Sequence, residues 1–216
     1  MINIYNQDCL EAMKLMKDNQ FDLAIVDPPY GINVANNSTG TVIRNKSDKD
    51  IFKIKDWDKC IPDKNYFLEL QRVSKNQIIW GGNYFLDYLG YCKAPIIWNK
   101  KNGASLYADG EMAWTSKGLP KNLKIWTHQW CGAFKASERG AIKYHPTQKP
   151  IALYEWLLMN YAKEGDKILD THLGSGSIAL ACHNLGFDLE GYELDKEYYD
   201  NALKRIKNHQ AQLRLI

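Results

Sequence analysis

The chain has 216 residues, of which 45% are hydrophobic, and a net charge of +3. This length suits one domain, 1–216, with a full hydrophobic core. So mild a charge does not by itself indicate a nucleic-acid partner. Five scattered cysteines without a Cys-x-x-Cys pair favour reduced thiols in a cytoplasm, and the absence of a long apolar run or a signal-peptide pattern argues against a membrane partner.

The N-terminal residues predict a strand, an acidic residue, a helix and a second strand. Residues 2–5 alternate weakly, Asp8 and Cys9 follow, and apolar residues then recur at helical spacing. The apolar run 23–26 is bounded by breakers, which predicts a strand buried on both faces of a parallel sheet within a βαβ unit. Asp27 therefore lies at the carboxyl end of that strand, where open α/β sheets bind ligands.

The tetrapeptide Asp27-Pro28-Pro29-Tyr30 combines an acid, a stiff loop and an aromatic ring. The two prolines fix two φ angles and remove two backbone donors, which leaves carbonyl groups free to accept hydrogen bonds. Tyr30 can stack on a planar ring while Asp27 and the Pro28 carbonyl accept from the ring's NH2 group, as adenine or cytosine would require. For the tetrapeptide alone, a helix-capping Asp beside a packing Tyr is the simpler interpretation, and the rest of the chain has to supply a cofactor site.

A long polar segment, 31–57, follows the tetrapeptide and mixes Asn, Ser, Thr and Gly with charged residues. Its length and its position predict a mobile, functional loop, and a solvated excursion without a role is the alternative. Beyond it, the pattern predicts a helix over 62–73 and strands at 77–80, 95–98 and 111–115, the last two forming a hairpin-like antiparallel edge.

Segment 116–144 lacks regular periodicity and is both basic and aromatic. Six basic residues oppose the single acid Glu138, which leaves +5, and aromatic rings are interleaved with them: Trp126, Trp130, Phe134 and Tyr144. Positive charges suit phosphates, and aromatic rings stack on unpaired bases at about 1–3 kcal/mol per base. We expect a short target-recognition insertion here; a solvated face over core aromatics is the alternative.

The last third of the chain predicts an element that cradles a nucleotide. The segment 145–150, His-Pro-Thr-Gln-Lys-Pro, enters a helix, and a strand at 167–170 then runs into a Gly-Ser-Gly turn that opens another helix. Glycines let a backbone approach a ligand, and a helix N-terminus favours negative charge. The next strand, 189–193, ends in Glu193, about twenty residues further on, where an acid can hold ribose hydroxyls. An amphipathic helix from Lys196 closes the chain.

Together these segments resemble the β group of DNA amino-methyltransferases, in which the Asp-Pro-Pro-Tyr strand precedes the target-recognition region and the cofactor loop comes last. The resemblance covers nearly the whole chain. It implies an α/β, Rossmann-like mixed seven-stranded sheet with helices on both faces, permuted so that the cofactor loop is C-terminal. It also implies S-adenosylmethionine as methyl donor and the N6 of a flipped-out adenine in double-stranded DNA as acceptor. Cytosine N4, RNA, a protein amide and an idle DNA-binding module remain alternatives.

The resemblance further assigns residues to two sites. The target-base site comprises Asp27, Pro28, Pro29 and Tyr30. The cofactor site comprises Asp8, Cys9, Asp27, Thr147, Lys149, Asp170, His172, Gly174, Ser175, Gly176 and Glu193. Within the cofactor site, Glu193 binds the ribose, Asp8 and Cys9 lie beside the adenine, and Thr147 and Lys149 contact the methionine end.

Two features depart from the family pattern. His172 stands where the family has a packing aromatic in Asp-Pro-Phe; the replacement leaves the fold assignment intact and bears on cofactor affinity. His172 is a poor candidate for a free-standing catalytic base. The recognition region is short, which favours a small target, loose specificity or help from the 31–57 loop. His128, Cys131 and His183 lack four-ligand spacing, so no metal is expected. A homodimer, a restriction endonuclease partner and a bacterial or phage-infected host are compatible with the resemblance.

Overall fold

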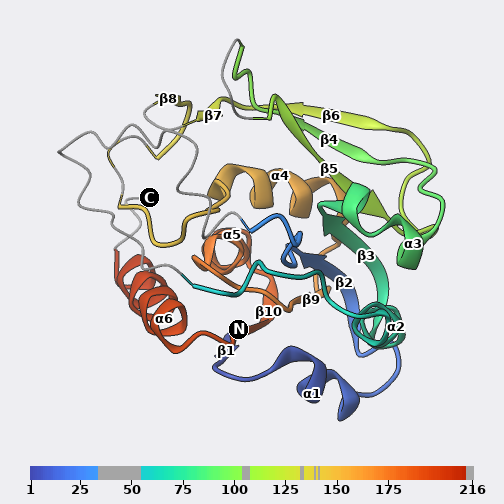
Figure 1. Cartoon of the computed structure of the whole chain (residues 1–216). Helices are drawn as coiled ribbons and strands as arrows, with labels where there is room; N and C mark the ends of the chain where they lie inside the picture. Colours follow the sequence, from blue (N-terminus) through green and yellow to red (C-terminus); the bar gives the residue numbers. More distant parts are fainter. Residues whose placement is uncertain (34–54, 104–107, 132–133, 139, 141, 213–216) are drawn as a thin grey trace.

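The computed structural model describes residues 1–33, 55–103, 108–131, 134–138, 140 and 142–212, and an eight-stranded sheet lies at its centre (Figure 1). The strand order is β1-β10-β9-β2-β3-β5-β4-β6. The strands are β1 (Ile2–Tyr5), β2 (Phe21–Val26), β3 (Ser74–Trp80), β4 (Ile96–Asn99), β5 (Gly110–Thr115), β6 (Lys124–Thr127), β9 (Lys167–Asp170) and β10 (Asp188–Tyr192). A separate two-stranded pair consists of β7 (Trp130–Cys131) and β8 (Phe134–Lys135).

Helices cover both faces of the sheet, as Figure 1 shows. One face packs against α1 (Cys9–Lys14), α2 (Lys64–Val73) and α3 (Leu86–Leu89), and a 3-10 turn, η1 (Gly82–Tyr84), precedes α3. The other face packs against α4 (Ile151–Tyr161), α5 (Ser177–Leu185) and α6 (Lys196–Gln210).

Strand β2 shows why its apolar run is continuous. Leu23 and Ile25 belong to the cluster on the α4–α5 face, whereas Ala24 and Val26 belong to the cluster on the α1–α2 face. All four are at most 1% exposed, so the predicted burial on both faces is confirmed. Successive side chains of a strand point to opposite faces, and only a strand covered on both sides needs apolar residues at every position.

The fold class is confirmed, and the number of strands is corrected from seven to eight. All seven expected strands are present, and β4 and β5 pair antiparallel, with Ile97 opposite Met112. However, β4 is not the edge, because β6 pairs parallel to its other side. This strand falls in the segment predicted to be irregular; four residues are too few to establish a period, and Trp126 is held there by packing against Trp98, with ring centroids 6.0 Å apart.

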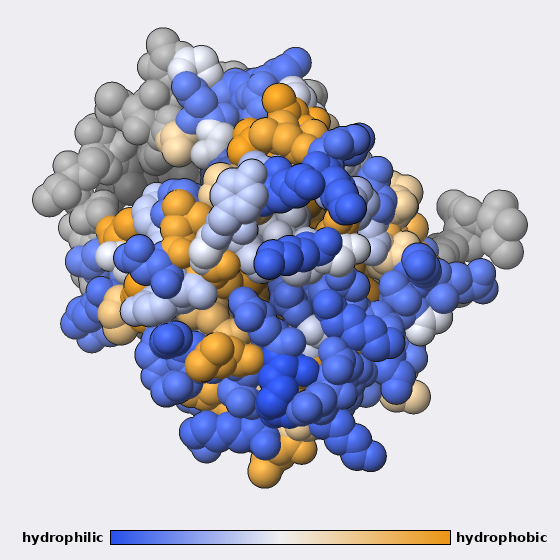
Figure 2. All heavy atoms as spheres, turned by 90° about the vertical axis from the view of Figure 1, so that its right-hand side faces the viewer, coloured by the Kyte–Doolittle hydropathy of each residue, from blue (hydrophilic) through white to orange (hydrophobic). Residues whose placement is uncertain are grey.

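Three further features are the expected 31–57 loop, the face that carries α2 and α3, and the apolar length of the helices. Most of the expected 31–57 loop lies outside the described residues. The face that carries α2 and α3 mixes apolar and charged side chains (Figure 2). Among the helices that the structure describes, none is both long and apolar enough to cross a membrane.

Candidate active site

Acidic residues gather at one edge of the sheet. Strands β1, β10, β9, β2 and β3 run parallel, so their carboxyl ends meet at the same edge. Asp8 follows β1, Asp27 follows β2, Asp170 ends β9 and Glu193 follows β10. Residues far apart in sequence thus reach the edge where open sheets bind ligands.

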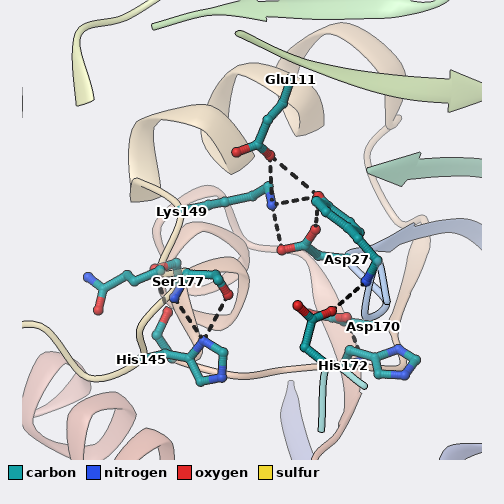
Figure 3. Close-up of polar contacts among 12 residues, drawn as sticks. Asp27, Glu111, His145, Lys149, Asp170, His172 and Ser177 are labelled. Carbon is teal, nitrogen blue, oxygen red and sulfur yellow. Dashed lines mark hydrogen bonds and ion pairs between the residues drawn. The ribbon is translucent and has the colours of Figure 1, made fainter. Parts of the chain in front are cut away.

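Each oxygen of the Asp27 carboxylate accepts a hydrogen bond (Figure 3). The Tyr30 hydroxyl donates to Oδ1 at 2.6 Å, and the Lys149 ammonium donates to Oδ2 at 2.5 Å. Burial raises the pKa of Asp27, and the positive charge of Lys149 opposes that effect. Tyr30 also stacks on Tyr84, with centroids 5.0 Å apart and rings 16° from parallel. The tetrapeptide therefore presents a carboxylate that accepts two hydrogen bonds and an aromatic ring that is stacked on Tyr84.

Glu111, on β5, is a member of this cluster that the sequence did not reveal. Its Oε2 lies 3.1 Å from the Lys149 nitrogen and accepts a 3.4 Å hydrogen bond from the Tyr30 hydroxyl, while Lys100 pairs with Oε1. Burial alone would raise the pKa of Glu111, but the two lysines outweigh it and lower the pKa to about 2. The one available signal was a carboxylate next to the apolar stretch Met-Ala-Trp of the same strand.

The segment 145–150 divides between the two sides of the site. Lys149, only 3% exposed, contacts Asp27 and Glu111 on the target side. Thr147 instead lies beside His145, with its Oγ1 3.1 Å from Nδ1. The His145 ring lies against the cofactor turn, so that a Cβ at Gly174 would be 3.5 Å from it. The structure thus brings Thr147 toward the cofactor turn, and it shows Lys149 paired with the target-site acids.

Asp58 fastens the loop that carries the tetrapeptide. Its side chain is buried, and its Oδ1 accepts hydrogen bonds from the backbone N–H groups of Tyr30 at 2.8 Å and Gly31 at 3.0 Å. Sequence reasoning missed this residue because it stands among charged neighbours typical of a solvated loop. Asp58 therefore holds the backbone of Tyr30 in place, and with it the position from which the Tyr30 side chain extends.

Asp58→Ala is expected to lower turnover about 10- to 100-fold, because two backbone donors lose a charged acceptor and the loop loses its orientation. Single-turnover methyl transfer would measure the loss, and cofactor affinity should stay within about twofold. Asp56→Ala is the matched control, since that side chain is exposed on the same segment. Wild-type turnover in Asp58→Ala would show that the loop does not depend on this carboxylate.

The Gly-Ser-Gly turn is held from two directions. Glu193 accepts from the N–H of Gly174 at 2.8 Å and from the N–H of Asp195 at 2.9 Å. Arg205, on α6, donates to the carbonyl of Ser175 at 2.9 Å. Gly176 has a φ of +74°, and a Cβ there would lie 3.3 Å from the Ala202 methyl, so glycine suits both its backbone and its space. The turn thus opens α5 in one defined shape.

Arg205 was also missed by sequence reasoning. It is 7% exposed, donates to the Ser177 hydroxyl at 3.0 Å, and pairs with Glu138 at 3.1 Å. An arginine in a polar helix has the pattern of a surface residue, and only the tertiary packing buries it. The pair connects the 116–144 segment to the cofactor turn.

His172 packs against an aromatic ring. Its ring meets Tyr66 edge-on, with centroids 5.3 Å apart, and its backbone N–H donates to Asp170 at 3.0 Å. Burial lowers the pKa of His172 to about 4, so the imidazole is neutral at neutral pH. A neutral, packed ring fills the space that the family gives to an aromatic residue.

Asp8 and Cys9 lie where β1 ends and α1 begins. Asp8 caps the helix by accepting from the N–H groups of Leu10 at 2.8 Å and Glu11 at 3.2 Å. Burial raises the pKa of the Cys9 thiol to about 12, so this sulfur is a thiol and not a nucleophilic thiolate.

Two acids at this edge, Asp170 and Glu193, have raised pKa values. Burial, with the charges of Asp27 and Glu193, raises the pKa of Asp170 to about 8, and burial also raises the pKa of Glu193. The positive charge of Lys149 opposes this rise in the pKa of Asp170. A group of acids of this kind favours a ligand that brings positive charge. Among the described residues, no group of three or more His, Cys, Asp or Glu side chains is placed to hold a metal ion.

Comparisons with known proteins agree with this geometry. The profile of a family described as DNA methylase (N6/N4) matches residues 21–204. The Type II methyltransferase M.HinfI of Haemophilus influenzae is 26% identical, over 94% of this chain and 68% of its own length. The Type II methyltransferase M2.DpnII of Streptococcus pneumoniae is 27% identical, over 94% and 89%. The crystal structure of the M1.HpyAVI–SAM complex is similar with a TM-score of 0.58 and 27% identity, covering 95% of this chain and 100% of that one.

Proposed function

Since the chain belongs to the N6/N4 DNA methylase family and uses S-adenosylmethionine as its methyl donor, we propose that it methylates the exocyclic N6 of adenine in double-stranded DNA. The observation that carries the proposal is the position of Asp27-Pro28-Pro29-Tyr30 at the carboxyl end of β2, where Asp27 is close enough to Asp170 for their charges to interact. An aspartate at the first position of the tetrapeptide favours adenine over cytosine N4 by family resemblance.

The residues of the cofactor turn fit S-adenosylmethionine. Its sulfonium and ammonium groups would bring positive charge close to the three acids Asp170, Asp27 and Glu193. Each Glu193 oxygen already accepts one backbone N–H and has a lone pair left for a ribose hydroxyl. Gly174 and Gly176 both have a positive φ, which glycine adopts without strain and which sets the shape of the turn. When bound, the cofactor supplies an electrophilic methyl group.

Cofactor binding is expected to release a proton from Asp170. With a pKa of about 8, this carboxyl is mostly protonated at pH 7, and a neighbouring cation lowers that pKa. Calorimetric titration at pH 7 should therefore give a binding enthalpy that varies with the ionisation enthalpy of the buffer. Asp170→Asn should lose that part of the variation. Identical enthalpies for the wild-type protein in all buffers would contradict this.

At the target side, the chain's residues orient an amine. The target nucleotide leaves the duplex at a cost of a few kcal/mol, and its base enters the pocket beside Tyr30. Asp27 and the Pro28 carbonyl would accept the two amine hydrogens and so favour a pyramidal nitrogen with its lone pair exposed. S-adenosylmethionine, held at the turn that carries Gly174 and Gly176, would supply the methyl group and would leave as the thioether. Orientation and fixed charge carry the reaction without a covalent enzyme intermediate.

DNA recognition is assigned to the segments 116–144 and 31–57 within a single domain, 1–216. Lys117, Lys121 and Lys124 are exposed ahead of and at the start of β6, where they can meet phosphates. The Type II relatives support a role in restriction-modification in the cytoplasm of a bacterium or a phage-infected cell. A homodimer and a partner endonuclease belong to the same proposal.

The test is to offer methyl-labelled S-adenosylmethionine to duplex DNA, RNA and protein. We expect label in duplex DNA. Label in RNA or protein would replace the substrate, and no label in any of them would favour an idle module.

A further inference from the structure

The geometry points to Glu111 as a positioning residue for the target amine. We propose that Glu111 takes over the hydrogen bonds of Lys149 and Tyr30 when the amine occupies Asp27. This inference rests on the proposed use of Asp27 as the amine acceptor.

In the structure, both carboxylate oxygens of Asp27 already accept a hydrogen bond. Its two oxygens accept from Tyr30 at 2.6 Å and from Lys149 at 2.5 Å. A carboxylate has about four lone-pair sites, but two short bonds to a side chain that is only 17% exposed leave little access for a ring amine. At least one of the two donors has to turn away for the amine to bind productively.

Glu111 is placed to receive either donor. Its Oε2 lies 3.1 Å from the Lys149 nitrogen and 3.4 Å from the Tyr30 hydroxyl, longer than the bonds these groups make to Asp27 (Figure 3). A small movement of either donor would shorten its bond to Glu111 and lengthen its bond to Asp27. The same oxygen thus serves as the second acceptor for both groups.

Charge makes the exchange feasible. Lys149 is only 3% exposed, and a buried ammonium left without any carboxylate partner would be costly. Glu111 stays ionised at neutral pH, since two lysines lower its pKa to about 2. Lys149 can therefore leave Asp27 without becoming an unpaired charge. Lys100 pairs with the other oxygen of Glu111 and keeps the group neutral overall.

The test is a comparison of Glu111→Gln and Glu111→Asp, each made in the wild-type chain, with Glu111→Gln also made in Lys149→Met. Turnover on duplex DNA, the affinity for S-adenosylmethionine and the melting temperature are measured for every variant. Glu111→Gln should lose about 10- to 100-fold in kcat because Lys149 then stays on Asp27, and cofactor affinity should stay within about twofold. Glu111→Asp should recover most of that loss, since it keeps the charge.

In the Lys149→Met background, Glu111→Gln should cost less than about threefold, because there is no ammonium left to hold. Wild-type kcat in Glu111→Gln, an equal loss in both backgrounds, or an Asp variant as slow as the Gln variant would each overturn the inference. A parallel loss of cofactor affinity would assign Glu111 a general structural role and would also overturn it. If the methylated base proves to be cytosine, the adenine proposal fails while these comparisons keep their meaning, since either amine meets Asp27.

Discussion

Asp27→Ala is expected to lower methyl transfer by about 10³-fold or more while cofactor affinity changes by less than about threefold. The substitution removes the acceptor that orients the amine, and oriented electrostatic groups commonly contribute effects of that size. The fold should tolerate the change, because Lys149 keeps Glu111 as a buried partner. The measurement is single-turnover transfer at saturating cofactor, with cofactor affinity measured by calorimetry.

Asp22→Ala is the matched control for this loss. Asp22 lies on the same strand, β2, toward its amino end, where it pairs with Lys75 and accepts from the N–H of Lys167. Its removal should leave kcat within about twofold. Substantial turnover in Asp27→Ala would remove the tetrapeptide from the chemistry, whereas equal losses in both variants would point to strand stability instead.

Glu193→Ala is expected to weaken cofactor binding by about 100-fold or more. The variant loses the proposed ribose contact and leaves the N–H groups of Gly174 and Asp195 without their charged acceptor, and each such bond contributes about 1.5–3 kcal/mol. The change should appear in the calorimetric Kd, and turnover at saturating cofactor should recover in part.

Glu190→Ala provides the control, on strand β10, which Glu193 follows. Its carboxylate accepts from the Tyr192 hydroxyl at 3.2 Å. We expect its Kd to match that of the wild-type protein. A Glu193→Ala protein with unchanged Kd would mean that the cofactor is held elsewhere at this edge of the sheet.

The elements with long, strong patterns were predictable from the sequence. The β2 run 23–26, the helix after the Gly-Ser-Gly turn and the β4–β5 hairpin all appear as expected, because burial on one or both faces imposes a period that can be counted. Strand β6 was not predictable, because it is short and is held by tertiary contacts of Trp126.

The site divides in the same way. Residues in local motifs, such as Asp27 and Glu193, were found because their motif places them at strand ends. Glu111, Asp58 and Arg205 were missed because each acts through a contact between distant segments; Arg205 and Ser175 are 30 residues apart. Lys149 was found by its motif, but its partners are Asp27, just after β2, and Glu111, on β5, and no local pattern specifies contacts between such distant segments.

The most direct test of the proposed activity is mass spectrometry of nucleosides from unmodified duplex DNA that has been incubated with the protein and S-adenosylmethionine. We predict N6-methyladenine from the wild-type protein and none from Asp27→Ala. N4-methylcytosine would contradict the choice of base and keep the mechanism, whereas DNA without any modified nucleoside would contradict the proposal that this chain methylates DNA.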